Sequence, residues 1–139
     1  MRPVSTKQYW EKEKWKANER TMSQHRRVLD EVSDNRKYPF TGMFHLSNLK
    51  MVQHGGGYQV LFWDGSGNFS PSEYAKITNE FLYYSSNHSA EITKMNGVAS
   101  ISFHIANKRD AYRLSRKYGN HSVWDWLNSE EIRTERRPK

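Results

Sequence analysis

The dipeptide Asn96-Gly97 lies between two segments in which apolar and polar residues alternate. Asn-Gly is the preferred pair for a type I′ turn, whose twist matches that of two antiparallel strands. In 98–105 the alternation is strict, which places the apolar side chains on one face of a strand and the polar ones on the other. We therefore expect a β-hairpin over 90–95 and 98–105, with one face in a core.

Two more signals organise the middle of the chain. A first hairpin is expected over 43–53 and 58–63, the two segments being joined by the glycine-rich loop His54-Gly55-Gly56-Gly57. The run Ser70-Pro71-Ser72-Glu73 then predicts the start of a helix over 71–85. Serine is a favoured N-cap, proline suits the first helical position, and the glutamate three residues later completes a capping box.

The remaining segments are expected to be helical. A long helix over 6–34 has few apolar residues, a helix over 107–118 is strongly amphipathic, and a short last helix follows Ser122. The predicted fold class is α+β. A long N-terminal helix precedes two hairpin–helix units, which form a four-stranded antiparallel sheet with helices on one face.

Charge is distributed unevenly along the 139 residues, which carry a net charge of +7. Residues 1–37 and 108–139 each have a net charge of +4, and the intervening 38–107 has −1. We interpret 1–37 as a basic helical extension, 38–132 as the α+β core domain and 133–139 as a charged tail. Two basic segments would thus flank a nearly neutral scaffold.

Composition excludes several classes of function. The chain has no cysteine, so disulfide scaffolds, thiolate metal sites and cysteine nucleophiles are ruled out. No apolar run approaches the roughly 20 residues of a membrane-spanning helix, and the first residues lead into charge rather than into a signal-peptide core. The expected location is therefore cytoplasmic, and no cofactor is indicated.

The helix over 107–118 supplies the strongest candidate for a binding site. Five cations on its polar side are spaced to meet the phosphates of a nucleic acid: Lys108, Arg109, Arg113, Arg116 and Lys117. The alternative is that these cations have no binding role and form the solvent-exposed side of an amphipathic helix. A second positive segment on the same small domain favours the nucleic-acid interpretation, because the fields of the two segments add.

The N-terminal helix is expected to extend this footprint. Its candidate phosphate contacts are Lys12, Lys16, Arg20, Arg26 and Arg27. Trp10 and Trp15 would stack on bases or anchor a protein interface, since aromatic faces beside cations serve both purposes. Trp124 and Trp126 are interpreted as packing the last segment onto the sheet.

Six histidines raise a catalytic alternative. None has the spacing of a metal motif, and no carboxylate cluster accompanies them, so no metal site is predicted. His104 lies on the polar face of its strand, and His45 could oppose it across the sheet. Such a pair could perform metal-independent acid–base chemistry on RNA.

The order of elements is similar to that of several α+β nucleic-acid-binding and nuclease units, including single-unit homing endonucleases. The acidic residue that closes a helix of small residues in that family has no counterpart in 6–34, so no site residue is transferred from it. The small, basic, cysteine-free composition also suits accessory proteins of phages and plasmids.

The preferred hypothesis is a non-catalytic accessory protein that binds nucleic acid, DNA and RNA not being distinguished. The first alternative is an inhibitor or assembly factor that docks on an acidic surface of a nucleic-acid-handling machine. The second is a small metal-independent nuclease centred on His45 and His104. Oligomeric state and sequence specificity are left open by these patterns.

Overall fold

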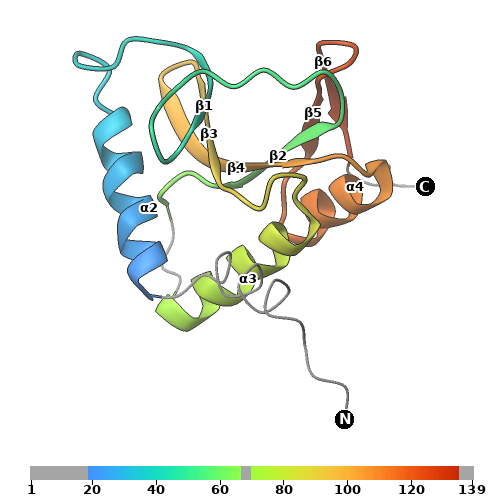
Figure 1. Ribbon diagram of the computed structural model, residues 1–139, viewed down its shortest axis with the longest axis horizontal. Helices are drawn as coiled ribbons and strands as arrows, with labels where there is room; N and C mark the ends of the chain where they lie inside the picture. Colours follow the sequence, from blue (N-terminus) through green and yellow to red (C-terminus); the bar gives the residue numbers. More distant parts are fainter. Residues whose placement is uncertain (1–18, 67–69, 135–139) are drawn as a thin grey trace, which may run out of the picture.

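The computed structural model describes residues 19–66 and 70–134. Its architecture is α+β, with three helices and one six-stranded antiparallel sheet in the described residues (Figure 1). The elements are α2 (Glu19–Val32), β1 (Gly42–His45), β2 (Tyr58–Trp63), α3 (Pro71–Tyr84), β3 (Glu91–Met95), β4 (Val98–Ile105), α4 (Lys108–Lys117), β5 (Ser122–Asp125) and β6 (Glu130–Arg133). The strand order across the sheet is β1-β3-β4-β2-β5-β6. None of the helices within 19–66 and 70–134 is long and apolar enough to cross a bilayer.

The hairpin around Asn96-Gly97 is confirmed. Both turn residues have positive φ angles, 52° and 79°, as a type I′ turn requires, and Met95 pairs with Val98 at its base. The hairpin does not lie beside a single neighbour but occupies the middle of the sheet. β3 pairs with β1, and β4 pairs with β2.

The prediction of four strands and a short C-terminal helix is wrong. The segment after Ser122 forms the β5–β6 hairpin, and β5 adds to the sheet beside β2. Asp125 lies in the segment predicted to be helical, but its side chain accepts hydrogen bonds from the backbone N–H groups of Leu127 and Asn128 at 3.0 and 3.4 Å. This turn, completed by Ser129 at a φ of 51°, reverses the chain.

The prediction of a hairpin over 43–53 and 58–63 is wrong, because β1 pairs with β3 and β2 pairs with β4. The predicted strand over 43–53 is also only partly extended. β1 ends at His45, and a tight turn follows in which Leu49 has a φ of 58° and donates its N–H to the carbonyl of His45 at 2.8 Å. Met51 then forms a single antiparallel bridge with Phe44. From there the chain crosses to β2 on the side of the sheet opposite α3 (Figure 1). We call residues 46–57 the strap.

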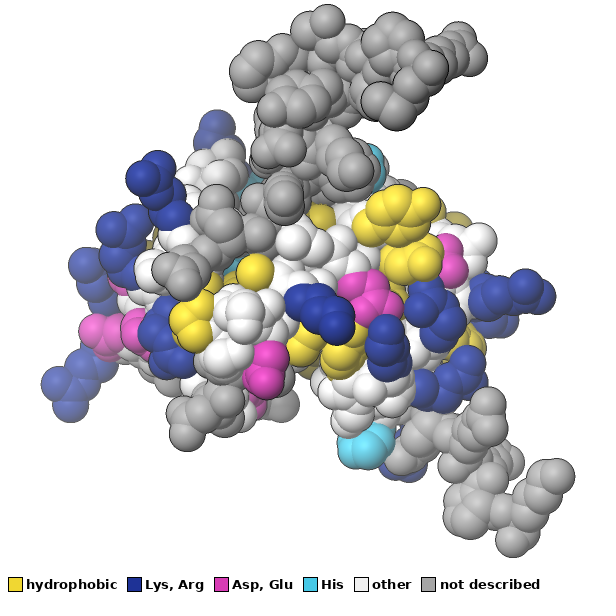
Figure 2. Space-filling view, turned by 90° about the horizontal axis from the view of Figure 1, so that it is seen from below, with side chains coloured by type: hydrophobic (Ala, Val, Ile, Leu, Met, Phe, Trp, Pro, Cys, Tyr) yellow, Lys and Arg dark blue, Asp and Glu magenta, His cyan; other side chains and the backbone are white. Residues whose placement is uncertain are grey.

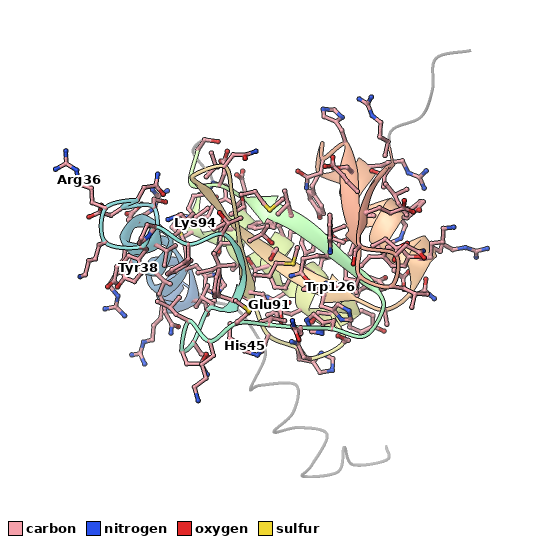
Figure 3. All side chains as sticks on the ribbon, turned by 90° about the horizontal axis from the view of Figure 1, so that it is seen from above. Arg36, Tyr38, His45, Glu91, Lys94 and Trp126 are labelled. Atoms are coloured by element: carbon pink, nitrogen blue, oxygen red, sulfur yellow. The ribbon has the colours of Figure 1, made fainter. Side chains whose placement is uncertain are left out.

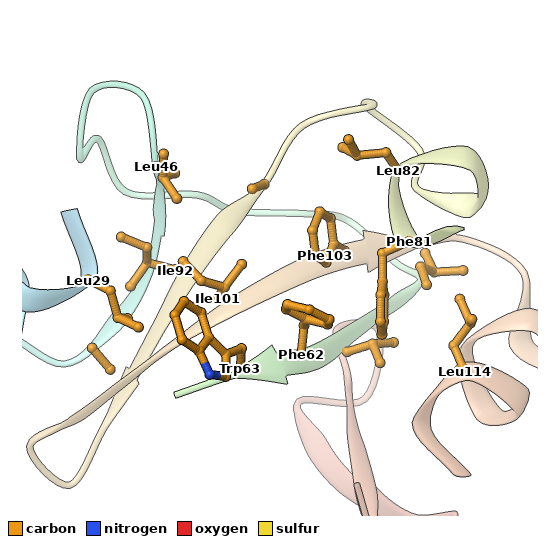
Figure 4. Close-up of a cluster of buried hydrophobic side chains, with 14 of the residues drawn as sticks. Leu29, Leu46, Phe62, Trp63, Phe81, Leu82, Ile92, Ile101, Phe103 and Leu114 are labelled. Carbon is orange, nitrogen blue, oxygen red and sulfur yellow. The ribbon is translucent and has the colours of Figure 1, made fainter. Parts of the chain in front are cut away.

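All three helices pack on one face of the sheet, as predicted. The apolar side of β4 contributes Ile101, Phe103 and Ile105, each fully buried. Phe81 of α3 stacks on Phe103 with ring centroids 5.1 Å apart, and Leu114 of α4 joins the same cluster (Figure 4). Burying each such side chain contributes about 1.5–3 kcal/mol, so this layer holds the fold together.

The helix predicted over 6–34 falls partly outside the described residues. Its described part, α2, ends at Val32 and packs into the core through Leu29 and Val32, which are 1% and 0% exposed. A buried lysine binds carbonyl groups at the C-terminal end of α2. Lys94 of β3 donates its ammonium protons to the carbonyls of Val32, at 2.7 Å, and of Tyr38. The lysine thereby satisfies carbonyls at the negative end of the helix.

The predicted cap of α3 is confirmed, and α4 has a cap that was not predicted. The Ser70 hydroxyl accepts the backbone N–H of Glu73 at 3.2 Å at the start of α3, with Pro71 in the first turn. The Asn107 side chain accepts the N–H of Asp110 at 3.0 Å at the start of α4. These caps fix where each helix begins, and hence where its polar side points.

Candidate functional site

The outward side of α4 gathers the cations that the sequence singled out. Ala111, Leu114 and Ser115 are buried against the sheet, so the basic residues of this helix face away from it. We call this region the α4 surface; its cations are Lys108, Arg109, Arg113, Arg116 and Lys117. In Figure 2 basic side chains gather over α4 on one side of the face that is seen from below.

Two carboxylates lie within the α4 surface: Asp110 of α4, 3.6 Å from Arg113, and Glu80 of α3. Glu80 of α3 accepts hydrogen bonds from Lys117 at 2.8 and 3.0 Å and lies 3.6 Å from Arg113. Burial alone would raise the pKa of Glu80, but hydrogen bonds from Lys117 and Tyr118 and the two nearby cations lower it overall. Two of the five cations are therefore engaged with a carboxylate.

The other three cations are open to solvent. Lys108, Arg109 and Arg116 are exposed, and none of them forms an ion pair with a carboxylate in the described ranges. Long basic side chains in this state can reach phosphate oxygens without first breaking an ion pair; the ammonium of Lys108 lies 5.4 Å from the ring centroid of Tyr112. The α4 surface thus keeps three cations available.

Tyrosines, which are not among the predicted stacking residues, lie beside these cations. The Arg113 guanidinium lies 4.6 Å from the ring centroid of Tyr84, and Tyr84 packs edge-on against Tyr83. Tyr83 is 66% exposed at the end of α3. Its position three residues after Glu80, on the outer side of a helix, is the signal that could have marked it.

The cations of α2 form a separate group. Arg20 and Arg27 are exposed, and the Arg26 guanidinium lies 4.8 Å from the ring centroid of Trp63. In Figure 2 basic side chains gather over α2 on one side and over α4 on the other, with acidic and apolar side chains between them. The other predicted contacts of the N-terminal helix lie outside the described residues: Lys12, Lys16, Trp10 and Trp15.

The second face of the sheet is polar and nevertheless buried, because the strap lies over it. We call it the covered face. Its buried polar side chains are Gln59, Glu91, Thr93, Ser100, Ser102 and His104. Several of them are hydrogen-bonded to each other across the strands, as in the contact from Thr93 to Ser102 at 2.9 Å. The covered face is therefore held together by hydrogen bonds rather than by apolar packing.

Glu91 is the centre of this network and is 0% exposed. Its carboxylate accepts hydrogen bonds from Nε2 of His54, at 3.0 and 3.2 Å, and from the side-chain amides of Gln59, at 2.8 Å, and Asn87, at 3.2 Å. Nδ1 of His45 lies 3.9 Å from the same carboxylate. A buried carboxylate is tolerated only with such donors around it.

His104 is fixed on both of its ring nitrogens. Nε2 donates to the carbonyl of Gly56 at 2.6 Å, and Nδ1 therefore accepts from the Ser86 hydroxyl at 2.5 Å. Burial lowers the pKa of His104. The His54 ring stacks on it with centroids 3.7 Å apart. His104 thus anchors the strap in its neutral form.

The predicted opposition of His45 and His104 across the sheet is not observed. Both lie on the covered face, but His45 pairs in register with Glu91 and His104 pairs with Gln59. The missed partner is His54, which contacts both Glu91 and His104. No local pattern could have found it, because the glycine loop around His54 is brought over Glu91 only by the strand order.

A groove adjoins this cluster. It has a volume of about 280 Å³, and its lining includes Met43, Met51, Met95, Trp124 and Trp126. Trp126 connects the groove to the network, since its Nε1 donates to Gln59 at 3.0 Å and its ring meets His54 edge-on at 5.3 Å. The tryptophans therefore line an opening as well as packing the β5–β6 hairpin.

No three His, Asp or Glu side chains converge to a possible metal site within 19–66 and 70–134. Comparison of the chain with protein-family models, with curated proteins and with solved structures gives no match.

Proposed function

We propose that this chain binds nucleic acid, without chemistry at the contact, through the α4 surface and the tyrosines at the end of α3. The observation that carries the proposal is the set of three exposed cations, Lys108, Arg109 and Arg116, which have no carboxylate partner in the described chain. They lie on the same helix face as Arg113, which contacts the ring of Tyr84, the neighbour of Tyr83.

The expected mechanism is phosphate neutralisation with stacking. Each cation that meets a phosphate releases counterions, so three contacts give a log–log salt slope of about −2.7 on duplex DNA and about −2 on a single strand. Exposed Tyr83 offers a ring face on which an unpaired base can stack, a contact worth about 1–3 kcal/mol. The combination favours single strands over duplexes.

The α2 cations add a second contact region, which only long strands would reach. Arg20 and Arg27 are exposed on α2, which lies on the far side of α3 from α4 (Figure 1). A strand that spans α3 would reach both groups, whereas a short one would occupy only the α4 surface. Affinity is therefore expected to rise with oligonucleotide length beyond what a single group of cations gives.

The test is a fluorescence-anisotropy titration of labelled single- and double-stranded DNA and RNA at two salt concentrations. The double variant R109E/R116E should weaken binding of every sequence alike and reduce the steepness of the salt dependence by about 2. The matched control is R36E/K50E, which makes the same change in net charge at two exposed residues outside the α4 surface. It should bind almost as the unmodified chain does.

Two outcomes of this titration would contradict the proposal. If R109E/R116E and R36E/K50E weaken binding equally, only the overall charge matters and the α4 surface is not a site. If no nucleic acid binds even at low salt, the proposal fails. An acidic protein surface then becomes the partner to examine, with Tyr83 as the aromatic anchor to truncate.

A further inference from the structure

The covered face places two imidazoles on one buried carboxylate. Oε2 of Glu91, on β3, lies 3.0 Å from Nε2 of His54, in the strap, and 3.9 Å from Nδ1 of His45, at the end of β1. Figure 3 shows His45, Glu91 and Trp126 following one another along the upper side of the sheet. Two histidines from neighbouring segments thus converge on a single oxygen of Glu91, which lies 37 positions after His54.

Structural need alone does not account for this convergence. A buried carboxylate is costly to desolvate, and replacing a buried ionic group by apolar packing is often neutral or stabilising. The fold already has a complete apolar core on the other face of the sheet. A carboxylate that faces two imidazoles is instead the arrangement that fixes the tautomer and orientation of catalytic histidines.

The two imidazoles are available for chemistry, unlike His104. Both nitrogens of His104 are engaged by Gly56 and Ser86. His54 and His45 each turn one nitrogen toward Glu91, which leaves Nδ1 of His54 and Nε2 of His45 on the far edges of the rings. Their side chains are 18% and 39% exposed, so both reach the surface.

The groove lies where a substrate of this site would rest. Trp126 forms part of its lining and also touches the His54 ring. Two tryptophan rings and the flexible thioethers of Met43 and Met51 suit a flat, unstacked nucleobase. A base in the groove would hold the adjoining sugar and phosphate beside the two histidines.

We propose that this site cleaves single-stranded RNA by acid–base transphosphorylation, with His54 as the base and His45 as the acid. RNA as the substrate rests on the nucleic-acid binding proposed above, although the residues are distinct from the α4 surface. Because Nε2–H of His54 donates to Glu91, the neutral ring keeps its lone pair on Nδ1, which fits it to accept a proton. RNA carries its own nucleophile, the 2′-hydroxyl.

The step balances without a further reactant. Nδ1 of His54 takes the proton of the 2′-hydroxyl, and the 2′-oxygen forms a bond to phosphorus. The bond between phosphorus and the 5′-oxygen breaks, and the leaving oxygen receives the proton from Nε2 of His45. The products are a 2′,3′-cyclic phosphate and a 5′-hydroxyl, and proton exchange with water restores both imidazoles.

The experiment incubates the full chain with a labelled single-stranded RNA of mixed sequence in EDTA, beside a DNA of the same sequence. Cleavage of RNA but not of DNA, with cyclic-phosphate ends, is expected. His54→Ala and His45→Ala should each lower the rate by about 100-fold or more. His121→Ala, which removes an exposed histidine outside this cluster, is the matched control and should cleave at the original rate.

Glu91 acts here as a positioning residue, and its variant needs a readout beyond rate. Glu91→Gln keeps an acceptor for His54 but removes the charge that faces both rings, so it should change the shape of the pH–rate profile as well as lower kcat. Circular dichroism checks that each variant folds. His45 is 39% exposed, so His45→Ala should fold even if the Glu91 variant does not.

A diribonucleotide separates this proposal from the first one, because it is too short to rest in the groove and reach the α4 surface. R109E/R116E should cleave it at the unmodified rate while losing affinity for long strands. Intact RNA, or a folded His45→Ala that cleaves as fast as the original chain, would overturn the acid–base proposal and leave the binding proposal standing.

Discussion

Gly57 lies directly against the imidazole of His104. A Cβ atom added at Gly57 would come within 2.5 Å of Nε2 and 2.8 Å of Cε1, and the backbone there has a φ of 79°. Both the space and the backbone angle therefore demand glycine at this point of the strap. The contact is what allows the Gly56 carbonyl to reach Nε2 of His104.

Gly57→Ala is expected to destabilise the fold by about 3 kcal/mol, from the strained backbone and the clash with the ring. Gly56→Ala is the matched control, because a Cβ there meets nothing within 4 Å; it should cost less than about 1 kcal/mol. Urea denaturation of both variants measures the difference. Equal stabilities would show that the strap is not clamped on His104.

Lowering the pH should reduce the free energy of unfolding through protonation of His25. Burial lowers the pKa of His25 to about 4, and its Nδ1 lies 2.5 Å from the Tyr74 hydroxyl. Because the folded pKa is below the unfolded value of about 6.5, the stabilisation is complete above pH 6.5 and is lost as the pH falls toward 4. The loss from this group is about 3 kcal/mol.

The measurement is the free energy of unfolding at pH 7.5 and pH 4.5 for the original chain and for His25→Gln, which keeps a partner for Tyr74. The variant should lose clearly less stability on acidification. Parallel losses in the two proteins would show that His25 is not buried in its neutral form. His104, whose pKa burial also lowers, adds to the acid sensitivity in the same direction.

Lys94→Met should loosen the end of α2. The buried ammonium holds the carbonyls of Val32 and Tyr38, and methionine would leave both without this donor at a cost of about 2–3 kcal/mol. Lys50→Met, at an exposed position, should change stability by less than about 0.5 kcal/mol. Hydrogen exchange of the α2 amides reports the loosening, and unchanged protection would contradict this role of Lys94.

Glu80→Gln should strengthen nucleic-acid binding. The substitution removes the carboxylate that holds Lys117, so one more cation becomes available to phosphates, while Arg113 keeps its contact with Asp110 at 3.6 Å. We expect an affinity gain of about tenfold at low salt and a steeper salt dependence. Glu73→Gln, an equal charge change at an exposed position on the same helix, should give a smaller gain with the salt slope unchanged. Equal gains would argue against the α4 surface.

Local signals predicted most of the elements. Asn96-Gly97 and Ser70-Pro71 each specify a turn or a cap within a few residues, and the structure has the hairpin and the helix where these signals place them. The C-terminal hairpin was missed because Asp125 serves equally well as a helix cap or as a turn acceptor. Its pairing with Tyr58, a distant residue of β2, decides the outcome.

The candidate sites likewise differ in whether local sequence signals could predict them. The basic side of α4 follows helical periodicity and could be read directly from the chain, whereas Glu80, which engages two of its cations, comes from another helix. His54 and Glu91 are 37 positions apart and meet only because the strap crosses the sheet. Periodicity describes one element at a time, so contacts made by the tertiary arrangement escape it.

The strand order has a consequence for how the chain assembles. β1 and β2 follow each other in sequence but are separated in the sheet by β3 and β4. During synthesis the first two strands therefore have no native neighbour until the central hairpin emerges and inserts between them. Their strand edges stay unpaired over that interval. We therefore expect the chain to be most prone to aggregate, or to need a chaperone, before the central hairpin has been synthesised.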